Sequence, residues 1–310
     1  MDYLCTQNQM YNSHLKKMKR RIKKNLWSIV VLTLLLSAQH QAAAQSLNVD
    51  ISGAEFLRPL VEQWIENYKA THDGFEANIT TDGKTSPDIK LDITAETGRG
   101  EVVGRYFMLP IAHAGSTLLS HKSLRHGVNR RVARELFVEP DLLEEADADK
   151  KHKTLPATVY YLTGRHAIPS QLLAHDLGVE TSSLRGKRVL GRPENVITAI
   201  LRTPDGLAYG IGSLAYDTKG RTLRKGLTVI PTDLDGDGKV SDAESHALAD
   251  LDALTAYLSP LPEVSIPIGQ FYMTHTESGK AFANWIMHNG QNQLTQQGYL
   301  KAPPSVVAQK

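Results

Sequence analysis

The chain has one cysteine, Cys5, and few aromatic residues, which make up 6% of its 310 residues. One thiol cannot form an intramolecular disulfide, so the fold must be stabilised by a hydrophobic core. The roughly 265 residues after position 45 are enough to bury such a core. Long apolar runs are also missing, since the run at residues 26–38 is shorter than the ~20 residues of a membrane-spanning helix. We therefore expect no stable membrane insertion.

The first 45 residues have the arrangement of a secretory signal peptide. Seven Lys and Arg side chains at positions 16–24 precede the apolar run, and the small-residue stretch QAAAQS follows it, with Ala42 and Ala44 placed for cleavage after Ala44. No cysteine follows the run where a lipoprotein carries its lipid. We predict that residues 1–45 are a signal peptide region and that the protein is periplasmic or secreted. An uncleaved N-terminal anchor is the alternative.

Neither sign of charge is in large excess. The chain has 35 Lys and Arg against 33 Asp and Glu, and without the signal peptide region the balance is 28 against 32. A nucleic-acid-binding domain instead concentrates positive charge on one face. The charge balance therefore predicts no nucleic-acid partner.

Strand-like and helix-like segments alternate after the signal peptide region. Residues 47–54 alternate as a short strand that ends in a Ser-Gly turn, and residues 56–72 place apolar side chains at helical spacing. The same order returns at residues 157–164 and 168–178, where a glycine is placed to end the helix. Strand, turn and helix in this order open an α/β unit, and the pattern fits two lobes of roughly a hundred residues each.

Four other segments carry weaker or different signals. We expect a long extended stretch broken by Pro110 at residues 105–120, because proline cannot donate to a strand ladder. Residues 243–258 and 278–297 each have the apolar period of one continuous helix. The segment 82–104 is rich in glycine and polar residues, and the pattern assigns no element to it.

The chain lacks the common catalytic motifs. Gly83, Lys84 and Thr85 match the end of a phosphate-binding Walker motif, but Asn78 stands where the motif needs its first glycine. No G-x-S-x-G nucleophile turn occurs, and the histidines fall into no zinc-site spacing. We therefore predict that the protein is not an enzyme, with a hydrolase as the remaining alternative.

Five short segments come in an order that is typical of one protein family. They span residues 51–69, 160–179, 204–217, 227–244 and 282–300. Through them the chain resembles the type II periplasmic binding proteins, specifically the phosphate-binding component of bacterial phosphate ABC importers, in a divergent form with an EF-hand-like calcium loop. The resemblance covers most of residues 47–300 and depends on the order and spacing of the segments, because each alone is a generic turn or helix.

The resemblance implies an α/β, two-lobed periplasmic-binding-protein type II fold with a hinge and an inter-lobe cleft. Lobe 1 would comprise residues 46–110 and 265–310, and lobe 2 residues 111–264. The implied function is the capture of a small anion such as phosphate in the cleft for an ABC permease. A receptor or partner module of the same fold, serving an outer-membrane system or binding another ligand, is the alternative.

Strand-to-helix turns can bind an anion in such a cleft, because helix N-termini present free N–H groups and a positive dipole end. The candidate contacts are Ser52, Gly53 and Ala54 in the first-lobe turn, Thr163, Gly164, Arg165 and His166 in the second-lobe turn, and Thr85. Arg165 can hold an oxyanion through two N–H groups at once. In the alternative interpretation, Thr163 only caps the helix and Arg165 lies in solvent.

Glu55 departs from the phosphate-binding pattern. It stands at the start of the first-lobe helix, where a hydroxyl is expected, and a carboxylate there competes with an anion for the same dipole. Three interpretations stay open at this stage. Glu55 points away from the site, it forms a salt bridge with Arg165, or the ligand is zwitterionic or cationic.

Residues 233–244, DLDGDGKVSDAE, match a calcium-binding EF-hand loop. The ligand positions fall on Asp233, Asp235, Asp237, the carbonyl of Lys239, Ser241 through a water, and Glu244. A strand precedes the loop and no second loop pairs with it, so the sequence predicts a structural Ca²⁺ site rather than a regulatory one. The alternative is an acidic turn that Asp-to-backbone hydrogen bonds close without metal.

Overall fold

The computed structural model describes residues 46–83, 86–94, 100–139, 157–261 and 264–303. The predicted signal peptide and Thr85 lie outside these residues. Among the residues that are described, none of the helices has the length and apolar character needed to cross a membrane.

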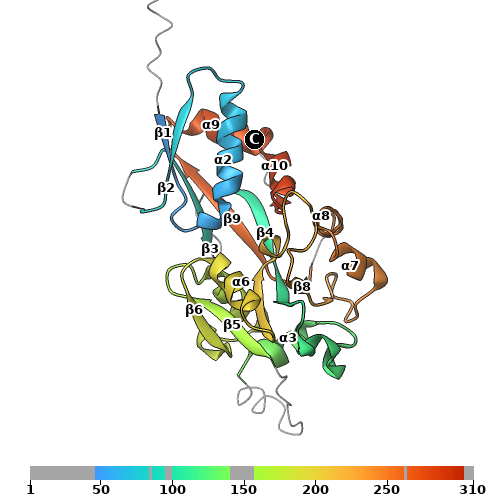
Figure 1. Cartoon of the computed structure of the whole chain (residues 1–310). Helices are drawn as coiled ribbons and strands as arrows, with labels where there is room; N and C mark the ends of the chain where they lie inside the picture. The colour runs from blue at the N-terminus through green and yellow to red at the C-terminus, as the bar shows by residue number, and fades with distance from the viewer. Residues whose placement is uncertain (1–45, 84–85, 95–99, 140–156, 262–263, 304–310) are drawn as a thin grey trace, which may run out of the picture. The chain divides into compact units, whose positions relative to one another are not determined.

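The strands of the described residues join in one ten-stranded sheet, in which two groups of strands share β4 (Figure 1). The first strand group contains β1 (Ser46–Asp50), β2 (Glu76–Thr80), β3 (Ile89–Thr94), β9 (Ile268–His275), β10 (Leu300–Lys301) and the first part of β4 (Glu101–His113). β1 runs parallel to β3, whereas β9 is antiparallel to both β3 and β4.

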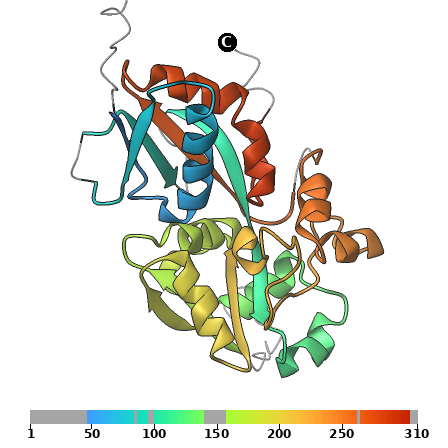
Figure 2. The ribbon, with the colours of Figure 1, turned by 45° about the horizontal axis from the view of Figure 1, so that its top comes forward.

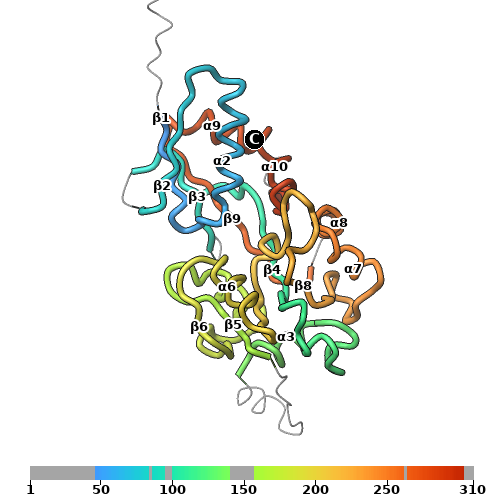
Figure 3. The backbone as a smooth tube through the Cα atoms, in the orientation of Figure 1, coloured from blue at the N-terminus to red at the C-terminus, as the bar shows by residue number. Residues whose placement is uncertain are grey.

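The second strand group begins where β4 leaves β9. It contains the last part of β4 with β5 (Thr158–Thr163), β6 (Lys187–Leu190), β7 (Gly206–Ile211) and β8 (Leu227–Val229). β7 and β8 are antiparallel to β4, and β5 is parallel to both β6 and β7. The backbone trace follows β4 from the first group into the second, where it lies beside β8 (Figure 3). One strand therefore links the two groups directly.

Helices flank both strand groups. They are α2 (Arg58–Lys69), α3 (Arg130–Phe137), α5 (Ile168–Leu177), α6 (Pro193–Leu201), α7 (Asp242–Ala247), α8 (Leu251–Leu258), α9 (Lys280–His288) and α10 (Gln291–Gln296). The buried face of α2 carries Leu60, Val61 and Trp64. Trp64 donates from its indole to the carbonyl of Gly290 at 2.9 Å, which holds α2 against the segment between α9 and α10. Figure 2 shows α2 beside these two helices.

The two helices expected after glycine turns are confirmed. The predicted helix at residues 56–72 is α2, preceded by a single 3₁₀ turn, η1 (Glu55–Leu57). The predicted helix at residues 168–178 is α5, and Gly178 ends it in the left-handed conformation at φ +70°. Glycine adopts that conformation without steric cost, which is why it was a reliable stop signal.

The expectation that Pro110 breaks the extended stretch is wrong. β4 runs without interruption through Pro110, which pairs with Tyr209 of β7. Proline lacks an N–H group, but its carbonyl still accepts a hydrogen bond from the amide of Ile230 at 3.0 Å. The strand ends at His113 rather than reaching residue 120, where a 3₁₀ turn stands instead.

The prediction of two long continuous helices near the C-terminus is also wrong, because each of them is divided into two shorter helices. Residues 243–258 form α7 and α8, and the carboxylate of Asp250 caps α8 by accepting from the amides of Asp252 and Ala253. Residues 278–297 form α9 and α10, which separate at Gly290. In both places the apolar period continues across the break, so periodicity alone could not reveal it.

Three strands were missed, and one of them is the two-residue β10. β3 lies in the segment to which no element was assigned, although its residues alternate between buried and partly exposed as in a regular strand. The surrounding glycines and charges concealed this short alternation. β6 is short and mostly exposed, and it precedes Gly191 and Arg192, which become important at the site.

Candidate ligand site

In the turn that follows β1, the donors predicted to bind an anion already donate to acceptors of the same segment. The amide and the hydroxyl of Ser52 both donate to the carboxylate of Asp50 at 3.0 Å, and the amide of Ala54 donates to the carbonyl of Ile51 at 2.8 Å. Asp50 is buried. Its carboxylate therefore takes the place that an external anion would have to occupy to reach Ser52. Gly53 adjoins these residues in the same turn.

In the turn that follows β5, the hydrogen bond that closes the turn does not involve the side chain of Arg165. Gly164 has φ +86°, and its carbonyl accepts from the amide of Ala167 at 3.1 Å, which closes the turn before α5. The hydroxyl of Thr163 donates to the carbonyl of Val189 at 3.3 Å, so it does not cap the helix. Arg165 and His166 come next and project from this turn.

Glu55 lies at the meeting point of three basic side chains, here called the Glu55 cluster. Its Oε1 is 3.3 Å from a guanidinium nitrogen of Arg165 and 3.9 Å from Nε2 of His166. Its Oε2 is 3.6 Å from a guanidinium nitrogen of Arg192. The Glu55 side chain is 15% exposed, whereas those of Arg165 and Arg192 are 61% and 59% exposed. Of the three interpretations of Glu55, the structure agrees with the salt bridge to Arg165.

Arg165 makes a second contact with the first strand group. Its guanidinium donates to the carbonyl of Thr81 at 3.4 Å, just after β2. Gly83, two residues further on, lies close to Ser52, since a Cβ placed on Gly83 would be 3.2 Å from the hydroxyl oxygen of Ser52. The segment that follows β2 therefore reaches the Glu55 cluster, although the predicted contact Thr85 lies outside the described residues.

Arg192 was missed from the sequence. It precedes α6 in the same way that Arg165 and His166 precede α5, because a strand, a glycine and an arginine lead to a helix with proline in its first turn in both places. The repeated Gly-Arg pair at the end of a strand was the available signal. It was overlooked because β6 was not recognised as a strand.

The electrostatics of the cluster favour an anion. Two guanidinium groups stand at the N-terminal ends of α5 and α6, where the free N–H groups and the helix dipole add positive potential. The carboxylate of Glu55 faces both of them, and the first turn of α6 also carries Glu194. An oxyanion with two or more acceptor oxygens could satisfy both guanidinium groups, since each can donate two parallel N–H groups.

Residues 233–244, here called the acidic loop, bring three carboxylates together. Single oxygens of Asp233, Asp235 and Asp237 all lie within 4.8 Å of one another. Asp233 is 3% exposed, and burial raises the pKa of its carboxyl group, an effect that the hydrogen bonds from Gly236 and Gly238 oppose. Hard oxygen donors at this spacing suit Ca²⁺.

Glu244 is not one of that group of three. Its Oε1 accepts from the amides of Leu234 and Asp235 at 2.6 and 3.3 Å, and its Oε2 accepts from the amide and hydroxyl of Ser241 at 2.7 and 2.9 Å. The hydroxyl of Ser241 also accepts from the amide of Glu244, which completes a capping box at the start of α7. Lys239 donates its amide to the carboxylate of Asp237 at 2.8 Å. The roles of Glu244, Ser241 and Lys239 as calcium ligands stay predictions.

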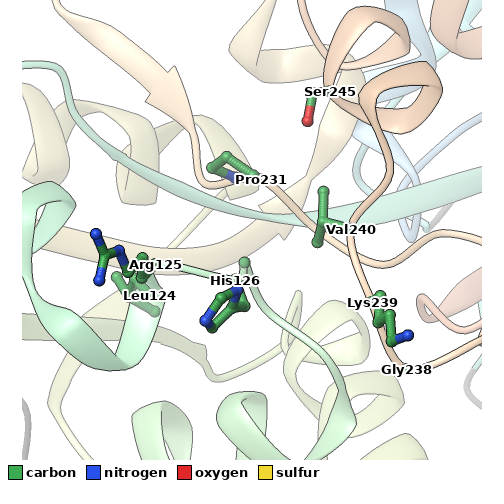
Figure 4. A pocket seen from close by; sticks show the side chains of 9 residues that line it. Leu124, Arg125, His126, Pro231, Gly238, Lys239, Val240 and Ser245 are labelled. Atoms are coloured by element: carbon green, nitrogen blue, oxygen red, sulfur yellow. The ribbon is translucent and has the colours of Figure 1, made fainter.

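A pocket of about 530 Å³ lies beside the acidic loop (Figure 4). Its lining includes three basic side chains, Arg125, His126 and Lys239, and no acidic one among the described residues. Arg125 and Lys239 lie on opposite sides of His126 in this view. None of the predicted anion contacts lines this pocket, so it is separate from the Glu55 cluster.

The sequence comparisons found no relative. No protein-family model matches the chain, and no curated protein sequence matches it.

The structural comparison found the same fold in binding proteins. A structure from Clostridium perfringens, described as a phosphate ABC transporter substrate-binding protein with bound phosphate, is similar at a TM-score of 0.51 and 14% identity, over 84% of this chain and 100% of that one. An ABC-type phosphate transport receptor from Vibrio cholerae is similar at a TM-score of 0.50 and 8% identity, over 83% of this chain and 100% of that one. At these identities the likeness concerns the fold alone. The chain therefore has the α/β, two-lobed fold of the type II periplasmic binding proteins, as predicted.

Proposed function

We propose that the protein is a periplasmic or secreted solute-binding protein that captures a small oxyanion, phosphate or phosphate-like, between its two lobes. One observation supports this most strongly: Arg165, His166 and Arg192, from two separate strand-to-helix turns, converge on the two oxygens of one carboxylate. Convergent cations at helix N-termini favour the binding of an oxyanion, because the guanidinium N–H groups add charged donors to the free N–H groups of the helices.

The proposed mechanism is closure of the two lobes over the solute. Lobe 1 would comprise residues 46–110 and 265–310, and lobe 2 residues 111–264, with β4 and the segment before β9 crossing between them. Solute contacts made from both lobes favour the closed form over the open one. An ABC permease would then recognise the closed form, and the protein itself would perform no catalysis.

The acidic loop is proposed to hold a structural Ca²⁺ ion. Asp233, Asp235 and Asp237 supply converging carboxylate oxygens, and the buried position of Asp233 concentrates negative charge that a cation would neutralise. Extracellular calcium modules bind at ~0.1 to 1 mM, a concentration range that suits a secreted protein. The ion would rigidify the turn before α7.

Calorimetric titration of the full chain with phosphate tests the solute proposal. The protein is first unfolded and refolded to remove any solute that was carried through purification. We expect saturable one-to-one binding that Arg165→Ala weakens by about 2–5 kcal/mol, or about 30-fold or more, because the substitution removes a charge pair with the solute that closure of the lobes would desolvate. Arg202→Ala is the matched control, since Arg202 is an exposed arginine just after α6 and outside the cluster.

The alternative is a receptor or partner module of the same fold. The observation in its favour is that Glu55 already faces the cations that a solute would need. Absence of binding heat from a correctly folded protein, with phosphate and with other oxyanions, would support this alternative. Equal affinity in the wild type and Arg165→Ala would instead place the solute elsewhere.

A further inference from the structure

We infer that the carboxylate of Glu55 is a resident occupant of the proposed oxyanion site, so that solute binds by displacing it. This inference rests on the proposed function, and it assigns to Glu55 the setting of solute affinity. The cations that would bind the solute and the cations that contact Glu55 are the same three side chains. One guanidinium nitrogen of Arg165 and one of Arg192 lie 3.3 and 3.6 Å from the carboxylate oxygens of Glu55, so an oxyanion that bridges these two nitrogens would occupy the position of the carboxylate.

The side chain of Glu55 is held by residues of other turns, not by residues of the turn that carries it. Within the part of the chain that the structure describes, the side-chain contacts of Glu55 are with Arg165, His166 and Arg192, which lie at least 110 positions away. The donors of the neighbouring turn are engaged elsewhere, since Ser52 donates to Asp50. Glu55 can therefore leave the cluster without breaking a hydrogen bond of the turn that carries it.

The contacts themselves are of the kind that exchanges easily. Both arginine side chains are more than half exposed, and the three N–O distances range from 3.3 to 3.9 Å. Ion pairs with exposed partners contribute little to stability, because water and salt screen them. A solute that makes shorter, paired hydrogen bonds with the same guanidinium groups could replace the carboxylate.

Tethering nevertheless makes Glu55 an effective competitor. A group held on the same chain acts at an effective concentration in the millimolar range or above. Solute therefore binds only in proportion to the time that the cluster is free of the carboxylate. Removing the charge of Glu55 while keeping its shape should raise the affinity for an oxyanion by up to about fivefold, the factor that corresponds to an ion pair with exposed partners.

Calorimetric titration with inorganic phosphate tests the exchange. The proteins compared are the wild type, Glu55→Gln, Glu55→Asp and Glu62→Gln, each as the full chain. Glu62 is the matched control, because it is an exposed carboxylate on α2 that pairs with Arg58 at 3.7 Å and lies outside the cluster. We expect tighter binding in Glu55→Gln, binding between the two in Glu55→Asp, and wild-type binding in Glu62→Gln.

The possible outcomes separate this inference from the proposed function. If Glu55→Gln binds phosphate no more tightly than the wild type, Glu55 is not a competitor, while the solute proposal stands. If neither protein binds phosphate or another small oxyanion although both unfold cooperatively, the solute proposal and the inferred displacement of Glu55 both fail. If Glu55→Gln does not fold, Glu55→Asp tests the inference instead. Its shorter side chain should compete less well with phosphate, so it should bind phosphate more tightly than the wild type, and equal affinity would contradict the inference.

Discussion

Glu55 and Glu244 are both shielded carboxylates beside a helix start, yet they are held in different ways. Glu244 is 1% exposed and accepts four hydrogen bonds from residues within ten positions of it. Glu55 is 15% exposed and faces three basic side chains that are at least 110 positions away. The partners of Glu244 are mainly backbone amides of its own loop, whereas the partners of Glu55 are long side chains from other turns.

The contrast separates a structural carboxylate from an exchangeable one. Backbone amides are fixed by the fold, so the removal of their acceptor leaves buried donors unsatisfied. Exposed guanidinium groups can instead turn to water or to another anion when their partner leaves. We therefore expect Glu244 to determine stability and Glu55 to determine binding.

The largest effect on stability is expected from Glu244→Ala. The substitution leaves the amides of Leu234 and Ser241 without their acceptor and removes half of the capping box of α7. Loss of a buried acceptor and of a cap should lower the free energy of unfolding by about 3 kcal/mol. Urea denaturation measures this loss.

Asp242→Ala is the control for that prediction. Asp242 is an exposed acidic residue in the first turn of the same helix, so its removal changes the charge near the helix start without opening a buried site. We expect it to cost under about 1 kcal/mol. A similar loss in both variants would mean that the hydrogen bonds of Glu244 do not stabilise the fold more than an exposed charge at the same helix start does.

The next effect comes from adding calcium to the acidic loop. At ten times the dissociation constant, an ion that binds only the folded state adds about 1.4 kcal/mol to the free energy of unfolding. Thermal unfolding at increasing Ca²⁺ concentrations measures this gain. The double variant Asp235→Asn with Asp237→Asn should lose it and retain the fold, because both side chains are exposed. An unfolding temperature that Ca²⁺ leaves unchanged would support the metal-free acidic turn.

The sequence predicts the acidic loop and the Glu55 cluster to different extents for a physical reason. The acidic loop is local, so its spacing of Asp and Gly already indicates where the carboxylates meet, and only the inward engagement of Glu244 needed the structure. The cluster joins residues from three turns, and its sequence signal is only a charge beside a glycine. Arg165 and His166 could be proposed from their turn, but Arg192 required the recognition of β6.

The same distinction applies to the fold. Helix α5 could be predicted because its stop signal is the local conformation of Gly178. The break between α9 and α10 lies at Gly290, whose carbonyl accepts from Trp64 of α2, and the helical period does not indicate this contact between residues 226 positions apart. The uninterrupted course of β4 through Pro110 likewise depends on neighbouring strands that supply its other hydrogen bonds.

A smaller effect on stability is expected from Glu55→Ala. Its two arginine partners are exposed, so the loss should be under about 1 kcal/mol and should nearly disappear at 1 M salt, where the Debye length is about 3 Å. Urea denaturation at low and high salt measures both values. The loss in Glu244→Ala should persist at high salt. A loss in Glu55→Ala that is large and insensitive to salt would contradict the interpretation of Glu55 as exchangeable.

The smallest effect concerns Asp205, a carboxylate whose partners are distant in sequence but are not cations. Its Oδ1 accepts from the amide and hydroxyl of Thr117 at 3.0 Å each and from the hydroxyl of Ser116 at 3.3 Å. The backbone amide of Thr117, then its hydroxyl, lowers the pKa of Asp205 in the folded protein. Asp205 thus combines the distant partners of Glu55 with the hydrogen-bond donors of Glu244.

The pH dependence of Asp205→Asn distinguishes which of these two properties matters. Because the folded pKa lies below the unfolded value of about 3.9, the ionised carboxylate stabilises the fold above that value, and the stabilisation disappears as the pH falls through the folded pKa. The difference in urea midpoint between the wild type and Asp205→Asn should be constant above about pH 5 and should shrink below about pH 4. A difference that is the same at pH 7 and pH 3 would mean that the protonated carboxyl group of Asp205 accepts from these donors as well as the carboxylate does. In that case hydrogen bonding rather than charge fixes Asp205, and fixed donors rather than sequence distance separate structural carboxylates from exchangeable ones.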